Sequence, residues 1–216
     1  MFLGPLLQIL GLNIAGIVTP GPDSFLVLRT AARSRKHAIA AVAGISSALI
    51  VWTTLAVSGA ALVITTHPEV LAYIKIIGGA WLLWMAYNFA ASALAQFRSP
   101  TPQALADPTA VLGSLASCYR QGLATNLSNP KAVLYFAAIV APLIPVGAPW
   151  WVHVLYVVAI IAESAIVFSL IAFFVSTARV RRRLVAAGPW IDAAAAVLFV
   201  IVSIGLISGG LGSLLG

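Results

Sequence analysis

Six long apolar segments constrain the fold of this chain more than any other feature of its sequence. A helix needs about 20 mostly apolar residues to cross a bilayer, and the segments reach that length at roughly residues 3–28, 38–65, 70–95, 121–145, 150–176 and 189–211. Hydrophobic residues make up 62% of the chain and charged residues 8%, whereas about a quarter of the residues in a soluble domain are charged. The sequence therefore predicts an all-α, polytopic membrane protein with six transmembrane helices in a lipid bilayer.

Prolines interrupt the first and the fourth of these segments. The first contains Thr19-Pro20-Gly21-Pro22-Asp23, and the fourth contains Asn126-Leu127-Ser128-Asn129-Pro130-Lys131. Proline removes a backbone donor and frees the carbonyl four residues before it. In a membrane, such irregular backbone survives only where it is buried in protein or lines a cavity. Paired interruptions in two halves of a chain point to a transporter binding site.

The two interruptions also suggest an internal repeat. Pro20 and Pro130 stand 110 residues apart, and residues 1–97 and 121–216 each contain three apolar segments. Residues 98–120 form a Pro-rich cytoplasmic linker with an interfacial segment between them. Because three is odd, the second half enters the membrane from the opposite side, which predicts a 3+3 inverted repeat with broken helices one and four. The alternative is that the halves are unrelated, since any six-span chain divides in this way.

Basic residues gather in three of the connecting loops. They are Arg29, Arg33, Arg35 and Lys36 after the first segment, Arg98 and Arg120 in the linker region, and Arg179, Arg181, Arg182 and Arg183 after the fifth. The positive-inside rule places these loops in the cytoplasm and both termini on the outer side. The net charge of +7 is therefore a topology signal, and we expect no nucleic-acid partner.

Cysteine and histidine usage argues against an enzyme. Cys118 is the single cysteine, so the chain can form no internal disulfide and no cysteine-based metal or redox site. The histidines His37, His67 and His153 fall in loops or at span ends, without a nucleophile partner. We expect no cofactor and no enzymatic activity.

Four charged residues lie within the apolar segments, where a charge costs about 2.5–3.5 kcal/mol on insertion scales. They are Asp23, Lys131, Glu163 and Asp192. Asp192 follows the start of the sixth segment, where an acid would complement the helix dipole. Lys131 could pair with Glu163 or Asp23, and Asp23 could cap the second half of the first helix. No helix end is expected near Glu163, which could serve substrate or proton binding.

A cavity with both signs of charge suits a zwitterion. Half-helix N-termini and Lys131 would attract a carboxylate, and Asp23 or Glu163 would hold an ammonium group or a proton. We expect Asp23 and Glu163 to be the proton-coupling residues. The expected substrate-binding residues are Asn13, Thr19, Pro20, Gly21, Pro22, Asp23, Asn126, Asn129, Pro130 and Lys131. The asparagines could instead satisfy only the broken backbone.

Two further possibilities stay open. A divalent metal-ion exporter could use Asp23, Glu163 and Asp192 as oxygen ligands, although Lys131 would repel a cation there. Small residues such as Gly44, Gly59, Gly78 and Gly79 favour close helix packing, either within the chain or in a homodimer.

The same residues resemble the LysE/RhtB family of bacterial inner-membrane amino-acid exporters. The similarity covers nearly the whole chain and includes residues 19–23, the stretch from Tyr119 to Ala132, and Gly78-Gly79-Ala80-Trp81 through Tyr87. It is nearer to the RhtB branch, whose substrates are homoserine, threonine and other neutral amino acids. One departure is Ala141-Pro142-Leu143, where the family often has Pro-Gln-Phe. The resemblance implies a secondary transporter that exports amino acids, driven by the proton motive force.

Overall fold

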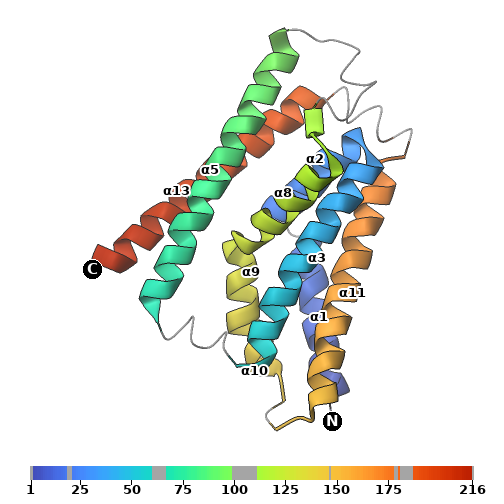
Figure 1. Ribbon diagram of the computed structural model, residues 1–216, viewed down its shortest axis with the longest axis vertical. Coiled ribbons are helices and arrows are strands. Elements are labelled where there is room, and N and C mark those ends of the chain that lie inside the picture. The colour runs from blue at the N-terminus through green and yellow to red at the C-terminus, as the bar shows by residue number, and fades with distance from the viewer. Residues whose placement is uncertain are drawn as a thin grey trace.

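The computed structural model describes residues 2–18, 21–59, 67–98, 111–145, 147–177, 180 and 187–215, and within them all of the regular structure is helical (Figure 1). The helices are α1 (Leu3–Val18), α2 (Pro22–Arg33), α3 (Arg35–Val57), α5 (Pro68–Arg98), α8 (Leu115–Leu127), α9 (Pro130–Tyr135), the π-helix η1 (Phe136–Val140), α10 (Ala141–Leu143), α11 (Trp150–Val175) and α13 (Gly188–Leu215). The predicted all-α class is confirmed for these residues.

Four of these helices, α3, α5, α11 and α13, are long and apolar enough to cross a membrane. The pair α1 and α2, bent by 60°, makes a fifth candidate. The fourth predicted segment is divided among α8, α9, η1 and α10, none of which is long enough alone. The membrane character of the chain is therefore confirmed, while the six-span inverted repeat and its division at residues 98–120 stay predictions.

Both proline motifs separate one helix from the next. The first helix ends at Val18 and α2 begins at Pro22, while α8 ends at Leu127 and α9 begins at Pro130. Proline is well suited to the first position of a helix, because the N–H that it lacks would have no partner there. Residues 115–120 belong to α8, which continues to Leu127, and the interfacial position expected for this part of the chain stays a prediction.

The helices form two groups. In Figure 1, α5 and α13 lie side by side, apart from a second group made of α1, α2, α3, α8, α9 and α11. The α5–α13 pair is held together by close packing at Gly79, whose carbonyl accepts a 2.7 Å hydrogen bond from Ser203 Oγ. It approaches the second group at Gly78, where an added Cβ would lie 2.8 Å from the carbonyl oxygen of Ser128.

A buried ion-pair cluster joins α2 to the α5–α13 pair. Asp192 on α13 is fully buried and accepts from Arg29 Nε at 2.7 Å and Arg33 Nη2 at 2.8 Å, both on α2. Ser92 Oγ and Gln96 Nε2 of α5 each donate to the same carboxylate at 2.8 Å. One carboxylate of α13 therefore binds side chains of both α2 and α5.

This cluster corrects the expected role of Asp192 as a simple complement to a helix dipole. The helix begins at Gly188, so Asp192 lies beyond its first turn, and its charge is balanced by two guanidinium groups. The same pairs argue against Asp192 as a metal ligand. Among the described residues, no group of three His, Cys, Asp or Glu side chains could hold a metal ion.

The closest helix contact in the second group lies between α3 and α8. An ideal Cβ at Gly44 would stand 2.0 Å from the carbonyl oxygen of Tyr119, and one at Gly122 would stand 2.1 Å from that of Ala41. Close packing at Gly44, Gly78 and Gly79 therefore agrees with the sequence prediction. Gly59 differs, since it has no neighbour within 4 Å and adopts a φ of +75° after the end of α3, a conformation that favours glycine.

Replacing Gly122 by alanine should lower the free energy of unfolding by about 1–3 kcal/mol, the usual cost of overpacking. The new methyl group would meet backbone atoms of α3, which cannot rotate away. The thermal unfolding midpoint of the purified protein in detergent measures this effect. Gly205→Ala on α13 is the matched control, because no atom lies within 4 Å of its added Cβ. Equal midpoints for the two variants would contradict this account of the α3–α8 contact.

Candidate functional site

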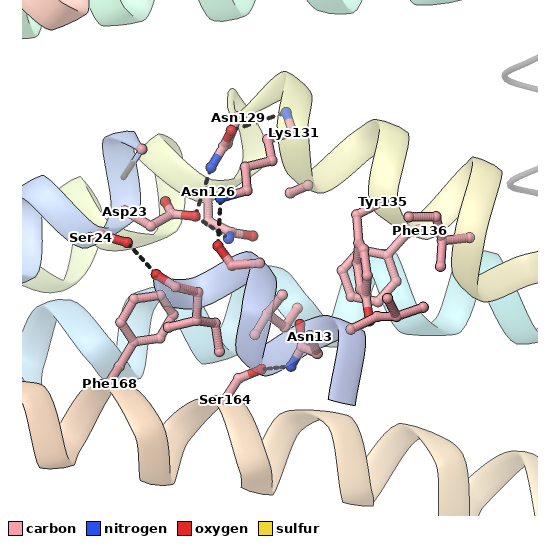
Figure 2. Close-up of a pocket in the computed structure, with 17 residues that line it drawn as sticks. Asn13, Asp23, Ser24, Asn126, Asn129, Lys131, Tyr135, Phe136, Ser164 and Phe168 are labelled. Carbon is pink, nitrogen blue, oxygen red and sulfur yellow. Dashed lines mark hydrogen bonds between the residues drawn. The ribbon is translucent and has the colours of Figure 1, made fainter. Parts of the chain in front are cut away.

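A cavity of about 630 Å³ lies where the two helix breaks meet, and Figure 2 shows the residues that line it. Its polar lining comes from Asn13, Asp23, Ser24, Asn126, Asn129, Lys131 and Ser164. Its apolar lining comes from Leu12, Ile17, Leu49, Ala132, Tyr135, Phe136, Ile139 and Phe168. Segments more than 100 residues apart in the chain therefore build one cavity with a polar and an apolar part.

Asp23 is the acidic group of this cavity. It lies in the first turn of α2, and its Oδ2 accepts from Asn126 Nδ2 at 2.9 Å and from Asn129 Nδ2 at 2.8 Å (Figure 2). Its Oδ1 is buried and has no hydrogen-bond partner among the described residues. The N-cap of α2 is Gly21, without a side-chain hydrogen bond. Asp23 therefore links the two breaks rather than capping its own helix.

Asn129 combines the two roles that the sequence left open for the asparagines. Its Oδ1 accepts from the backbone N–H of Lys131 at 3.1 Å, which caps α9. Its amide nitrogen donates to Asp23. One side chain thus satisfies a donor at the start of α9, which a helix leaves without a partner, and holds the carboxylate of the other break.

The broken end of α1 is stabilised by side chains from its surroundings. Helix α1 ends at Val18, so the carbonyl of Gly16, in its last turn, has no partner within the helix. This carbonyl accepts from Lys131 Nζ. The carbonyl of Ile17 accepts from Ser24 Oγ at 2.8 Å. Lys131 also lies close enough to Asp23 for their charges to interact. The lysine of the second break therefore reaches to the first.

A second polar group lies between α1 and α11. Asn13 Nδ2 donates to Glu163 Oε2 at 2.7 Å and to Ser164 Oγ at 2.8 Å. Glu163 Oε1 is buried and has no hydrogen-bond partner in the described part of the chain. Asn13 and Ser164 line the cavity, whereas Glu163 is not among its lining residues.

Most of the expected binding residues lie together. Those that line the cavity are Asn13, Gly21, Asp23, Asn126, Asn129 and Lys131. Pro22 is buried at the start of α2 and is not among the lining residues. Pro130 begins α9, and Thr19 and Pro20 lie outside the described residues.

The sequence reasoning missed Ser164 and the aromatic wall of Tyr135, Phe136 and Phe168. A signal for Ser164 existed, because it is a polar residue beside Glu163 in an otherwise apolar segment. The aromatic residues gave no such signal, because they are surrounded in the sequence by many other apolar residues.

The sequence profile of the LysE type translocators matches residues 14–210, which is nearly the whole chain. The chain belongs to the LysE family. It is 34% identical over 200 residues to the threonine efflux protein of Escherichia coli K12, covering 90% of this chain and 93% of that protein. It is also 31% identical over 133 residues to the leucine efflux protein of Klebsiella pneumoniae, covering 61% and 59%. No solved structure matches the chain.

Membership of the LysE family confirms the resemblance seen in the sequence. It also confirms that the protein is a transporter and not an enzyme, because the family consists of translocators. The matched range contains Asp23, Lys131 and Glu163, and it begins one residue after Asn13.

Proposed function

We propose that this LysE family protein exports neutral amino acids from the cytoplasm across the bacterial inner membrane, driven by the proton motive force. The observation that carries the proposal is the cavity between the two breaks, which presents Asp23 and Lys131 on its polar side. The relatives named threonine efflux protein and leucine efflux protein support it.

Each part of a zwitterionic amino acid finds a suitable group in this cavity. The open Oδ1 of Asp23 is an acceptor for the ammonium group, and the Lys131 ammonium is a donor for the carboxylate, since charge-assisted hydrogen bonds are the strong ones. Asn126 and Asn129 keep Asp23 in place. The pairing of opposite charges would offset the cost of burying both ends of the substrate.

The apolar part of the cavity is suited to the amino-acid side chain. Leu49, Phe136 and Phe168 contribute no charge there, so a charged substrate side chain would be buried without a partner. A cavity of about 630 Å³ lies within the range of about 300–1,000 Å³ that ligand sites occupy. The expected substrates are therefore amino acids with neutral side chains, from homoserine and threonine to leucine.

The proposed orientation of the protein in the membrane rests on the positions of the basic residues along the chain. In Figure 1, α1 begins at the lower end of the view, α13 ends at its left edge, and α2 lies in the upper part. With the basic loops in the cytoplasm, both termini face the outer side, as the sequence predicts.

A substrate panel in proteoliposomes tests this proposal. With an imposed pH gradient, purified protein should transport labelled threonine, homoserine and leucine, and it should not transport lysine or glutamate. Liposomes without protein and liposomes without a gradient are the controls. Absence of gradient-dependent flux for all three neutral amino acids, or faster flux of lysine than of any of them, would contradict the proposal.

A further inference from the structure

Two carboxylates beside the cavity share an unusual pattern of hydrogen bonds. Asp23 and Glu163 each have one oxygen that accepts from asparagine amides. In each, the other oxygen is buried without a hydrogen-bond partner among the described residues. A buried polar atom without a partner costs about 1–3 kcal/mol. Both oxygens are therefore suited to a cationic group or a proton that arrives during the transport cycle.

The two carboxylates differ in their access to the cavity. Asp23 lines it directly (Figure 2). Glu163 is not among the lining residues, whereas Asn13, which bonds to it, and its neighbour Ser164 are. A zwitterion in the cavity can thus reach Asp23 but meets neutral side chains in front of Glu163. A proton needs no such space, and chains of acidic side chains relay protons in many membrane transporters.

We infer that the two carboxylates have different roles in the transport cycle: Asp23 binds the substrate ammonium group, and Glu163 binds the coupled proton. This inference rests on the proposed function. A proton from the outer side binds the Glu163 carboxylate and is released to the cytoplasm, while the zwitterion moves outward. No covalent bond other than the O–H bond forms or breaks, and the glutamate returns to its ionised form at the end of the cycle.

The surroundings of Glu163 are consistent with a single proton-binding group. Helix α1 contributes Asn13 and carries no ionisable side chain. From α9, Tyr135 lies close enough to interact with the charge of Glu163. The ionisable residues of α2 are Asp23, Arg29 and Arg33, and those of α3 are Arg35, Lys36 and His37 in its first turn. Arg29 and Arg33 are paired with Asp192.

Two assays on the same proteoliposomes separate the two roles. The first measures threonine transport driven by a pH gradient. The second measures exchange of labelled for unlabelled threonine without a gradient, which needs substrate binding but no net proton movement. Glu163→Gln should lose gradient-driven transport and its pH dependence, and it should keep exchange. Asp23→Asn should lose both. Glu69→Gln is the matched control, because Glu69 is exposed in the first turn of α5.

The outcomes are distinct. Retained gradient-driven transport in Glu163→Gln, or loss of exchange in a variant that elutes as folded protein, would overturn the division of roles. If Glu163→Gln does not fold, Glu163→Asp is the variant that decides. It keeps an ionisable carboxylate and should therefore keep proton-coupled transport. Loss of gradient-driven transport in Glu163→Asp, with exchange retained, would overturn the inference. Absence of both activities in the wild-type protein for all three neutral amino acids would overturn the proposed function itself and, with it, the inference.

Discussion

Replacement of Asp23 by asparagine should abolish amino-acid transport while leaving the protein folded. The substitution preserves the shape of the side chain and an oxygen that can accept from Asn126 and Asn129, but it removes the negative charge. A substrate ammonium group would then be buried without its counter-charge, which costs about 3–5 kcal/mol. That cost corresponds to a loss of affinity of more than about 100-fold, measurable as flux in proteoliposomes and as lost stabilisation by threonine in thermal unfolding.

The control for this prediction is Asp107→Asn, the same substitution in the Pro-rich linker. It should transport as the wild type does. Normal transport by Asp23→Asn would mean that the carboxylate does not bind the ammonium group, and the assignment of the cavity would then be wrong.

Replacement of Asp192 by alanine should have the largest effect on stability. It would leave Arg29 and Arg33, which are 5% and 7% exposed, without the carboxylate that both contact. Breaking a buried ion pair by removing one partner costs about 3–5 kcal/mol. The expected result is a strong fall in the thermal unfolding midpoint and in the yield of folded protein. Glu69→Ala, which removes an exposed acid, should change the free energy of unfolding by no more than about 0.5 kcal/mol.

A double variant shows whether the loss comes from the ion pairs. Arg33→Met combined with Asp192→Ala should be less destabilising than the sum of the two single changes, because interacting residues are not additive. Arg33 is the suitable partner, since its Nη1 already lacks a hydrogen-bond partner among the described residues. Additive effects would show that Asp192 acts through something other than these contacts.

The helix breaks could be predicted because their cause is local. Pro22 and Pro130 begin helices in the structure, as the loss of a backbone donor requires. The charged and amide residues of the site were also predictable, because a polar side chain in an apolar segment needs a partner. Asp23, Asn126, Asn129 and Lys131 accordingly line one cavity.

Asp192 shows where local reasoning fails. Its position near Pro189 is typical of an acid that complements a helix dipole, but its partners Arg29 and Arg33 lie 163 and 159 residues away. The sequence predicts that all three lie near the cytoplasmic side, but it does not pair them.

The sequence by itself determined the membrane character, the places where helices break and the chemistry available at each break. These properties follow from the polarity of each segment and from the backbone of proline, which act over a few residues. Only the tertiary structure decided that Lys131 reaches the carbonyl of Gly16, that Phe136 and Phe168 line the cavity, and that Glu163 bonds to Asn13 without lining it. In a segment that is apolar on every side, the face turned to protein and the face turned to lipid have the same composition, so contacts between distant helices make the choice.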